Sequence, residues 1–554
     1  ELCLTGYTCG DLFFQDTLLR GAEDALGQML EATRPVDMLV ALGLPVRAAG
    51  KLYNCAAVLC RGELLGLVPK TCLPNYGEFY EKRWFEPGPE EEFLSLTLCG
   101  QEVFLGKRHL FRCDTLPDLV VGVEICEDLW SSAPPSVFLA QSGATLILNL
   151  SASNETVGKA DYRRALVAGQ SGRLMCGYVY ADAGEGESTT DLVFAGHNLI
   201  AENGTVLAER RFADGLTVSE VDVARIAFER RRITTFPPAR QERMDWSEFS
   251  LEPVETSLTR PIGTNPFVPD DSGDRDRRCR EILHIAALGL KKRLAHTGAK
   301  SAVVGLSGGL DSTLALLITA RAMDLLGRPR TDITAVTMPC FGTTSRTKSN
   351  AQLLAERIGT TFQTIDIGDA VRVHFRDIGQ SMDDLSVTFE NGQARERTQV
   401  LMDVANHQGG LVIGTGDLSE LALGWATYNG DHMSMYGVNG SIPKTLVRHL
   451  VAYSADTVEP SDPELAAVLR DILDTPVSPE LLPPKEGEIA QRTEDLVGPY
   501  ELHDFFLYYA VRWGFSPRKV FRLALYALGN RYDRAAILKW LQNFYRRFFA
   551  QQFK

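Results

Sequence analysis

Short apolar runs alternate with helix-like stretches along the first 235 residues. Helical spacing of apolar residues predicts helices in two of the stretches, 18–32 and 159–171. The pattern predicts an α/β fold in which helices and sheets form separate layers. The runs with the length and β-branched content of buried strands are 38–42, 56–59, 119–125 and 145–150.

After residue 276 the alternation becomes more regular, beginning with an amphipathic helix expected at 277–295. Strands that alternate with helices predict right-handed βαβ units, and therefore a doubly wound parallel sheet. The expected strands are 302–306, 333–338, 362–367 and 411–414, and the expected helices between them are 310–326 and 347–358.

Two stretches rich in proline and acidic residues interrupt these patterns. Residues 236–275 carry Pro, Gly, Ser and Asp at a density that breaks helices and strands, so they predict a linker with little structure of its own. The linker divides the chain into domains at 1–235 and 276–554. The second stretch, about 458–488, predicts a loop inside the second domain.

Composition narrows the class of protein. The 554 residues are 45% hydrophobic and 23% charged, as in globular proteins, and 57 basic against 71 acidic residues give a net charge of −14. This charge counts against a general affinity for nucleic acid or anionic membranes. No apolar run of about 18 residues predicts a membrane span. The 11 scattered cysteines indicate reduced thiols and a cytoplasmic protein.

The sharpest motif is a loop between a strand and a helix. An apolar strand ends at Leu306, two glycines turn the chain, and the helix begins after them. Glycine N–H groups and a helix N-terminus bind anions. Because the loop lacks the Gly-Lys-Ser/Thr of a Walker A motif, it suits pyrophosphate held during chemistry at an α-phosphate. The loop residues are Ser307, Gly308, Gly309, Leu310, Asp311 and Ser312.

This loop resembles the pyrophosphatase loop of the ATP-dependent adenylating synthetases, which include NAD, GMP and asparagine synthetases and tRNA thiolation enzymes. Later strings resemble the NAD synthetases in particular, and the resemblance runs from about 276 to the C-terminus. The strings are Asn-Gly-Gln-Ala-Arg-Glu-Arg at 391–397, Gly-Thr-Gly-Asp-Leu-Ser-Glu at 414–420, Gly-Trp-Ala-Thr-Tyr-Asn-Gly-Asp at 424–431, Pro-Lys-Thr-Leu-Val-Arg at 443–448 and Gln-Arg-Thr-Glu-Asp at 491–495.

The resemblance implies a role for each matched residue. The loop at 307–312 and Thr415 would bind ATP. Asp311 and Glu420 would carry Mg²⁺, a hard cation that prefers carboxylate and phosphate oxygens. The residues that would line the deamido-NAD and pyrophosphate positions are Asn391, Arg395, Asp431 and Lys444.

A cysteine in the first domain stands apart from the other thiols. Cys126 follows the strand at 119–125 and sits where a helix is expected to begin. Helix N–H groups favour a thiolate and can hold an oxyanion. The carboxylate of Glu1 could take the thiol proton, and the ammonium of Lys70 could stabilise a tetrahedral intermediate.

The strings around these three residues, 1–7, 69–80 and 120–130, resemble the nitrilase superfamily and the glutaminase domains fused to NAD synthetases. The resemblance implies an α-β-β-α sandwich with Cys126 as nucleophile, Glu1 as general base and Lys70 as the cation on the oxyanion side. Glu78 would be a second, supporting glutamate. The residues that would contact glutamine are Tyr76, Glu127, Ser153 and Lys159.

Two departures from the family pattern concern the ends of the sequence. The sequence begins on the proposed base, without the strand that the family places before it, and it stops where family members continue. We therefore expect a sequence clipped at both ends, with a first domain that lacks its first strand.

Together these resemblances imply a glutamine-dependent NAD synthetase. Glutamine hydrolysis would supply ammonia, and Mg-ATP would adenylate deamido-NAD, releasing pyrophosphate, AMP and glutamate. The resemblance also implies a homo-oligomer, an octamer. Two alternatives stay open: an ammonia-only synthetase with a non-catalytic first domain, and another adenylating amidotransferase whose acceptor is a nucleotide or tRNA. The acidic charge counts against tRNA.

Overall fold

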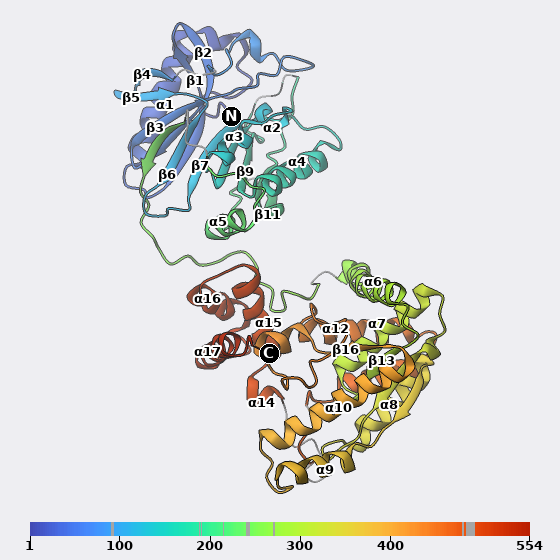
Figure 1. Ribbon diagram of the computed structural model, residues 1–554. Coiled ribbons are helices and arrows are strands. Elements are labelled where there is room, and N and C mark those ends of the chain that lie inside the picture. The colour runs from blue at the N-terminus through green and yellow to red at the C-terminus, as the bar shows by residue number, and fades with distance from the viewer. Residues whose placement is uncertain are drawn as a thin grey trace. The chain divides into compact units, whose positions relative to one another are not determined.

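The computed structural model of the chain divides into two compact units, Glu1–Pro261 (unit 1) and Ile262–Lys554 (unit 2) (Figure 1). Gln491 and Arg492 of the last sequence string lie outside the described residues. The structure describes residues 1–89, 93–187, 189, 191–213, 215–239, 244–269, 272–478, 481–483 and 493–553.

Unit 1 contains two sheets. The first has the order β1-β2-β3-β5-β4, and all its neighbours are antiparallel except β3 and β5. Its strands are β1 (Leu39–Ala48), β2 (Lys51–Cys60), β3 (Glu63–Pro69), β4 (Leu94–Leu98) and β5 (Gln101–Leu105).

The second sheet has the order β11-β10-β9-β8-β7-β6-β12, with a parallel centre formed by β7, β8 and β9. Its strands are β6 (His109–Cys113), β7 (Val120–Ile125), β8 (Leu146–Ser151), β9 (Gly177–Asp182), β10 (Asn198–Glu202), β11 (Thr205–Arg210) and β12 (Asp245–Phe249). The helices of unit 1 are α1 (Asp16–Thr33), α2 (Glu127–Trp130), α3 (Pro135–Gln141), α4 (Lys159–Leu174) and α5 (Val223–Arg232).

The two sheets pack face to face between layers of helices, which confirms the α-β-β-α sandwich (Figure 1). Val58 of β2 and Val123 of β7 belong to the apolar cluster between the sheets. Leu26 of α1 packs on the outer face of the first sheet, and Val167 of α4 packs on the outer face of the second. The strands and helices expected from the sequence are all present; β1 and β2 extend beyond the apolar runs that predicted them, whereas β7 and β8 keep close to theirs.

The expected linker contains regular structure. Strand β12, inside 236–275, pairs in parallel with β6 and so completes the second sheet. Its sequence Asp-Trp-Ser-Glu-Phe has two apolar residues three positions apart, which lie on opposite faces of the sheet: Trp246 packs on the outer face, and Phe249 is buried between the two sheets. The prediction of little structure is therefore wrong at this strand, because the strand is short, lies among prolines and has no alternating pattern.

Unit 2 is built on a five-stranded sheet of order β15-β14-β13-β16-β17, in which all neighbours are parallel. The strands are β13 (Ala302–Gly305), β14 (Ile333–Thr337), β15 (Thr361–Thr364), β16 (Leu411–Gly414) and β17 (Tyr436–Gly437). The helices are α6 (Ser272–Thr297), α7 (Leu310–Leu326), α8 (Ser345–Ile358), α9 (Gly368–Ile378), α10 (Val387–Gln408), α11 (Leu418–Leu423), α12 (Lys444–Val458), α13 (Pro463–Leu473), α14 (Thr493–Val497), α15 (Tyr500–Leu507), α16 (Pro517–Leu528) and α17 (Arg534–Ala550).

Helices cover both faces of this sheet, which confirms the doubly wound prediction. On β13, Val304 belongs to the cluster that includes α7 and α12, whereas its neighbour Val303 packs with α9 and α10. Successive side chains of a strand point to opposite faces, so a strand buried on both faces reads as a continuous apolar run. This is the reason that the sequence pattern identified the strand.

The loop expected at about 458–488 is wrong in part, because α13 occupies Pro463–Leu473. Asp462 caps this helix by accepting a hydrogen bond from the Leu465 N–H at 3.0 Å, and Pro463 occupies its first turn. Leu465, Ala466, Leu469 and Ile472 then form one buried face. Proline and aspartate here begin a helix, whereas they were interpreted as signs of a loop.

Other features bear on the surface of the chain. In the part of the chain that the structure describes, no helix is both long and apolar enough to cross a membrane. All 11 cysteines are described, and none is in a disulfide.

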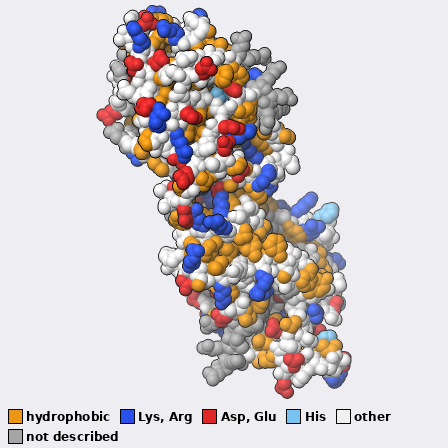
Figure 2. Space-filling model, turned by 90° about the vertical axis from the view of Figure 1, so that its left-hand side faces the viewer, with side chains coloured by type: hydrophobic (Ala, Val, Ile, Leu, Met, Phe, Trp, Pro, Cys, Tyr) orange, Lys and Arg blue, Asp and Glu red, His pale blue; other side chains and the backbone are white. Residues whose placement is uncertain are grey.

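Large hydrophobic side chains are exposed on the C-terminal helices of unit 2. Tyr526 of α16, Leu538 of α17 and Phe549 near the end of α17 are examples, and Phe549 is 74% exposed. Figure 2 shows hydrophobic side chains gathered on one face of this unit. Exposed apolar area of this kind is typical of a surface that contacts another molecule.

Candidate functional site

The first candidate site is centred on Cys126, between the end of β7 and the start of α2. Its backbone has φ 47° and ψ −101°, a conformation that non-glycine residues rarely adopt. The residue is 6% exposed. A strained backbone at a buried thiol is typical of a functional position, because the surrounding structure has to hold it in place.

A buried ammonium lies between two carboxylates in the same site. Lys70 Nζ is 2.7 Å from Glu1 Oε1 and 2.5 Å from Glu81 Oε1, and all three side chains are almost inaccessible to solvent. Burial and the nearby Glu1 raise the pKa of Glu81 to about 7, although Lys70 opposes this shift. Burial also disfavours the charged form of Glu1, but the charges of Lys70 and of the Glu1 amino group, with hydrogen bonds from Lys70 and Asn54, together lower the pKa of this carboxyl.

The thiol of Cys126 is held in its neutral form. Burial raises its pKa, and the neighbouring Glu1 carboxylate adds to the shift, while Lys70 and Ser151 act against it. A neutral thiol is a weak nucleophile, so it needs a base to accept its proton. Glu1, which stays ionised, is the carboxylate suited to that role.

The second glutamate differs from the sequence expectation. Glu81, not Glu78, contacts Lys70, and it also accepts a 2.7 Å hydrogen bond from the Tyr7 hydroxyl. The Glu78 carboxylate accepts instead from the side chain of Asn154. The motif after Lys70 contains both glutamates, three residues apart, and only the fold determines which one faces the ammonium.

The residues expected to contact glutamine make their hydrogen bonds outside the Glu1–Lys70–Glu81 group. The Tyr76 hydroxyl donates to Glu127 Oε1 at 2.7 Å. Ser153 is buried and its hydroxyl accepts from Arg163 at 3.1 Å. Lys159 Nζ donates to the Asn154 side chain and lies 5.1 Å from the ring centroid of Trp130. Tyr76 and Lys159 thus lie within electrostatic range of the thiol and Glu127 follows it in the chain, whereas the contacts of Ser153 are with Arg163 and Asp182.

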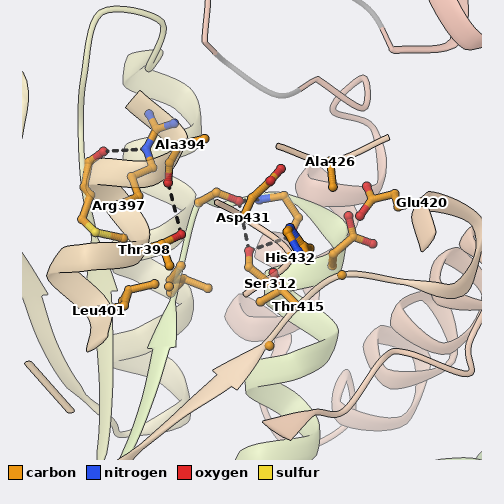
Figure 3. A pocket seen from close by; sticks show the side chains of 18 of the residues that line it. Ser312, Ala394, Arg397, Thr398, Leu401, Thr415, Glu420, Ala426, Asp431 and His432 are labelled. Atoms are coloured by element: carbon orange, nitrogen blue, oxygen red, sulfur yellow. Dashed lines mark hydrogen bonds between the residues drawn. The ribbon is translucent and has the colours of Figure 1, made fainter. Parts of the chain in front are cut away.

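The second candidate site is a cavity in unit 2 at the carboxyl ends of β13 and β16. Its volume is about 260 Å³, and its lining includes the loop residues Ser307, Gly309, Asp311 and Ser312 (Figure 3). Gly308 has φ +85°, and a Cβ there would lie 2.2 Å from the Thr347 carbonyl oxygen, so only glycine fits this turn. The loop leads directly into α7, whose N-terminus faces the cavity side of the sheet.

A group of three carboxylates and one lysine lies beside this cavity. Lys444 Nζ is 2.6 Å from Asp311 Oδ2, 2.9 Å from Asp417 Oδ2 and 2.9 Å from Glu420 Oε1. Burial raises the pKa of Glu420 to about 7 and raises that of Asp417, although Lys444 acts against both shifts. Carboxylate oxygens of all three residues lie within 4.8 Å of one another, which suits a shared cation.

These residues fit Mg²⁺ by their chemistry. Carboxylate oxygens from two side chains, completed by substrate phosphates, are the ligand set that Mg²⁺ prefers. Asp311 Oδ1 is buried and has no hydrogen-bond partner among the described residues, so it is available as a ligand. Asp417 was not singled out in the sequence, although it lies three residues before Glu420 and its carboxylate caps α11.

The remaining expected residues divide into two groups. Thr415 and Asp431 line the cavity, whereas Asn391 is not part of its lining, and its Oδ1 accepts from the Thr427 hydroxyl at 2.8 Å. Arg395 is exposed, does not line the cavity, and donates to the Tyr428 carbonyl oxygen at 3.2 Å.

Arg397 and His432 are among the cavity residues that the sequence interpretation missed. Arg397 lines the cavity and donates to the Met338 carbonyl oxygen at 3.3 Å (Figure 3). Its signal was its place in the same string as Arg395, two positions further along a helix, where side chains point in different directions. His432 also lines the cavity, and its Nδ1 donates to the Thr427 carbonyl oxygen at 2.8 Å.

Comparisons with known proteins agree with the two-site arrangement. Residues 1–231 match the carbon–nitrogen hydrolase family, and residues 282–512 match the NAD synthase family. The chain is 42% identical over 589 residues to the glutamine-dependent NAD(+) synthetase of Mycobacterium bovis, covering 100% of this chain and 86% of the relative. The protein of that name from Mycobacterium leprae is 42% identical over 587 residues, with coverage of 100% and 86%.

Solved structures include similar chains. The crystal structure of a glutamine-dependent NAD(+) synthetase from Cytophaga hutchinsonii is 23% identical with a TM-score of 0.41, and the comparison covers 100% of this chain and 86% of that chain.

Proposed function

The chain belongs to the family of glutamine-dependent NAD(+) synthetases, and we propose how its two sites divide the reaction. It is a glutamine-hydrolysing carbon–nitrogen ligase with a carbon–nitrogen hydrolase domain and an NAD synthase domain. The first site releases ammonia from glutamine. The second uses ATP to activate the carboxylate of deamido-NAD, which ammonia then converts to the amide of NAD. The domains follow the division 1–235, 236–275 and 276–554, with β12 belonging structurally to the first domain.

In unit 1, Glu1 accepts the thiol proton of Cys126, and the thiolate attacks the carboxamide carbon of glutamine. Lys70 presents its ammonium to the oxygen that becomes negative in the tetrahedral intermediate. The C–N bond breaks as Glu1 returns the proton to nitrogen, so ammonia leaves and a glutamyl thioester remains. Glu1 then takes a proton from water, whose hydroxide adds to the thioester carbon; the C–S bond breaks, Glu1 returns the proton to the Cys126 sulfur, and glutamate departs.

The pKa values of the two groups support this sequence of steps. Burial and Glu1 raise the pKa of Cys126, so the thiolate forms only when a base removes the proton. Burial disfavours the charged form of Glu1, but Lys70, the Glu1 amino group and the Asn54 hydrogen bond together lower the pKa of this carboxyl, so the base is ionised at the start. Tyr76, Glu127, Ser153 and Lys159 remain our candidates for binding glutamine, and their positions around Cys126 support that assignment.

In unit 2, the loop at 307–312 holds the phosphates of ATP, and Thr415 contacts the nucleotide. The nicotinate carboxylate attacks the α-phosphate, and pyrophosphate leaves. Ammonia then attacks the carbonyl carbon of the adenylate, loses a proton, and displaces AMP. Asp311 and Glu420 hold Mg²⁺, which when bound neutralises the phosphate charge during adenylation. Asn391, Arg395, Asp431 and Lys444 stay our candidates for the dinucleotide and pyrophosphate positions, joined by Arg397 as a cavity residue.

The observation that carries this proposal is the placement of Cys126 beside the buried Glu1–Lys70 pair in the same chain as a phosphate-loop cavity. We also propose a cytoplasmic homo-oligomer, an octamer in the pattern of the family. The unpaired cysteines support the compartment, and the exposed apolar area of unit 2 supports self-association (Figure 2).

Cys126→Ala tests the assignment with two nitrogen sources. NAD formation from glutamine is expected to fall to background, because a covalent route without its nucleophile leaves only weak residual catalysis. NAD formation from ammonium should persist, since the groups of the second site lie in unit 2. Both rates are measured on one purified preparation, so that misfolding, which lowers both, is separated from lost chemistry. Glutamine-dependent synthesis at the parent rate would make Cys126 a core cysteine.

A further inference from the structure

The backbone N–H of Cys126 is bound twice. It donates to the Leu150 carbonyl oxygen at 3.0 Å and to the side-chain Oδ1 of Asn149 at 3.1 Å. Both acceptors belong to β8, which runs parallel to β7, and Asn149 is 1% exposed. An N–H occupied by two acceptors is not available to a substrate oxyanion, so other donors have to meet that charge.

Asn149 is itself held by two further buried groups. Its Nδ2 donates to the Tyr178 hydroxyl oxygen at 3.0 Å, and that hydroxyl donates to Glu124 Oε1. The second oxygen of Glu124 accepts from the Ser136 N–H at 2.8 Å. Tyr178 is fully buried and Glu124 is 1% exposed, so water does not compete for these hydrogen bonds.

The groups at the two ends of this chain of hydrogen bonds determine which partner donates and which accepts. The N–H groups of Cys126 and Ser136 can only donate. Oδ1 of Asn149 must therefore face Cys126, which leaves Nδ2 to donate to Tyr178. The Tyr178 hydroxyl then has its proton to donate to Glu124, which accepts at both oxygens in its ionised form. Any other orientation of the Asn149 amide would place its N–H groups against the Cys126 N–H.

The strained backbone of Cys126 explains why this chain of hydrogen bonds is needed. Cys126 has φ 47° and ψ −101°, and a residue in this region stays there only when its surroundings over-determine it. The Leu150 carbonyl contact belongs to the sheet, whereas the Asn149 contact comes from a side chain that is oriented by two others.

We propose that Asn149, oriented by Tyr178 and Glu124, is a positioning residue that fixes the backbone at Cys126 so that its thiol faces glutamine and Glu1. This inference rests on the proposed role of Cys126 as the nucleophile. Neither Asn149 nor Tyr178 contacts the substrate in this account; both act through the backbone of Cys126.

Tyr178→Phe tests the inference because it keeps the ring and removes only the hydroxyl. The kcat of glutamine hydrolysis is expected to fall about tenfold or more, while the KM for glutamine stays within about twofold. Asn149→Ala should reduce kcat at least as far. The kcat of the double variant Asn149→Ala/Tyr178→Phe should be no lower than that of Asn149→Ala alone, because the two side chains act through the same chain of hydrogen bonds. Ammonium-dependent NAD formation should equal that of the parent in all three.

Thr145→Val is the matched control. Thr145 is a buried residue at the opposite end of β8, where its hydroxyl donates to the Asp118 carbonyl oxygen at 2.6 Å and accepts from the Val120 N–H at 3.1 Å. Like Tyr178→Phe, it removes one buried hydroxyl from the same sheet, so it should lower thermal stability without changing kcat. If kcat fell equally for Thr145→Val, the lower kcat of Tyr178→Phe would be explained by lost stability alone.

A kcat within about twofold of the parent for Tyr178→Phe would overturn the positioning role. Cys126→Ala, measured in parallel, separates this failure from that of the proposed function. If Cys126→Ala abolishes hydrolysis while Tyr178→Phe does not reduce it, only the positioning role is lost. If Cys126→Ala still hydrolyses glutamine, the proposed function itself fails.

Discussion

At the scale of single residues, the first site depends on one ammonium between two carboxylates. Glu1 accepts three hydrogen bonds and keeps one acceptor position on Oε2: Oε1 accepts from Lys70 and from Asn54 at 2.6 Å, and Oε2 accepts from the Ala152 N–H at 3.0 Å. Glu81 has one oxygen, Oε2, without a hydrogen-bond partner among the described residues, and its pKa is raised to about 7 by burial and by Glu1. Protonation of Glu81 therefore leaves Lys70 matched by Glu1 alone.

Lys70→Met is expected to abolish glutamine hydrolysis. The sequence alone suggests that Met keeps the fold, because it matches the stem and removes only the charge. The structure changes this expectation: two buried carboxylates would lose their cation, and breaking a buried pair in this way costs about 3–5 kcal/mol. Urea unfolding measures the stability, and glutamate release measures the hydrolysis.

The double variant Lys70→Met/Glu81→Gln is the control for this prediction. It removes one of the two unpaired carboxylates, so it should recover part of the lost stability without restoring hydrolysis. Both roles of Lys70 would be contradicted if the free energy of unfolding of Lys70→Met were within about 1 kcal/mol of the parent and its rate of glutamine hydrolysis fell less than about tenfold.

At the scale of elements, α15 fixes the start of α12, the helix that carries Lys444. Pro443, at the N-cap of α12, offers no side-chain hydrogen bond. Asp504 of α15 replaces it, because its Oδ2 accepts from the Thr445 N–H at 2.8 Å. Its other oxygen accepts from Ser419 of α11, whose hydroxyl accepts from the Lys444 N–H at 2.8 Å. A carboxylate at a helix N-terminus is stabilising, and here it joins three helices at the second site.

Asp504→Ala should lower NAD formation from both nitrogen sources, since it releases the start of α12 and the partner of Ser419. Loss of the cap should also lower stability by about 1–2 kcal/mol. Asp533→Ala is the matched control, because Asp533 caps α17 by accepting from the Ala536 N–H at 2.7 Å, and α17 carries none of the expected site residues. The measurement is the steady-state rate of NAD formation with ammonium. Equal losses of this rate in the two variants would mean that Asp504 acts on stability alone.

At the scale of the whole molecule, each unit contains its own sheets, its own apolar core and its own site. The candidate residues of the first site all lie within Glu1–Pro261, and those of the second site all lie within Ile262–Lys554. The two partial reactions are therefore expected to be separable by single substitutions, one on each side of the division.

Asp311→Asn should remove NAD formation from glutamine and from ammonium alike. The substitution removes a carboxylate from the group that fits Mg²⁺, and a lost metal ligand removes charge stabilisation worth several kcal/mol, on the order of a thousandfold in rate. Glutamate release from glutamine should survive in part. Asp324→Asn is the control: it makes the same change on α7, but Asp324 is half-exposed, pairs with Arg330 at 2.6 Å, and does not line the cavity. Near-normal synthesis by Asp311→Asn with ammonium at saturating magnesium would remove the metal assignment.

Features that depend on neighbouring residues were predictable from the sequence. The strand before Ser307, the helix after Gly309 and the strand that ends at Cys126 all follow from continuous apolar runs and from glycine between them. Each of these signals comes from residues close in the chain, where backbone limits and the period of burial act directly. The α13 helix was missed although its cap is local, because proline and aspartate serve both loops and helix starts.

The sequence by itself thus predicted a layered α/β first half, a doubly wound second half, the glycine loop at 307–312 and the position of Cys126 between strand and helix, because strand, turn and helix are specified by local spacing; the α-β-β-α sandwich followed from the resemblance to a family. Only the tertiary structure decided that Glu81 rather than Glu78 meets Lys70, that Asn149 holds the Cys126 N–H, and that Asp504 caps α12. These pairs are separated by 11, 23 and 59 positions along the chain. No periodicity relates residues at such distances; packing of the sheets and helices brings them together, and burial then gives each contact its strength.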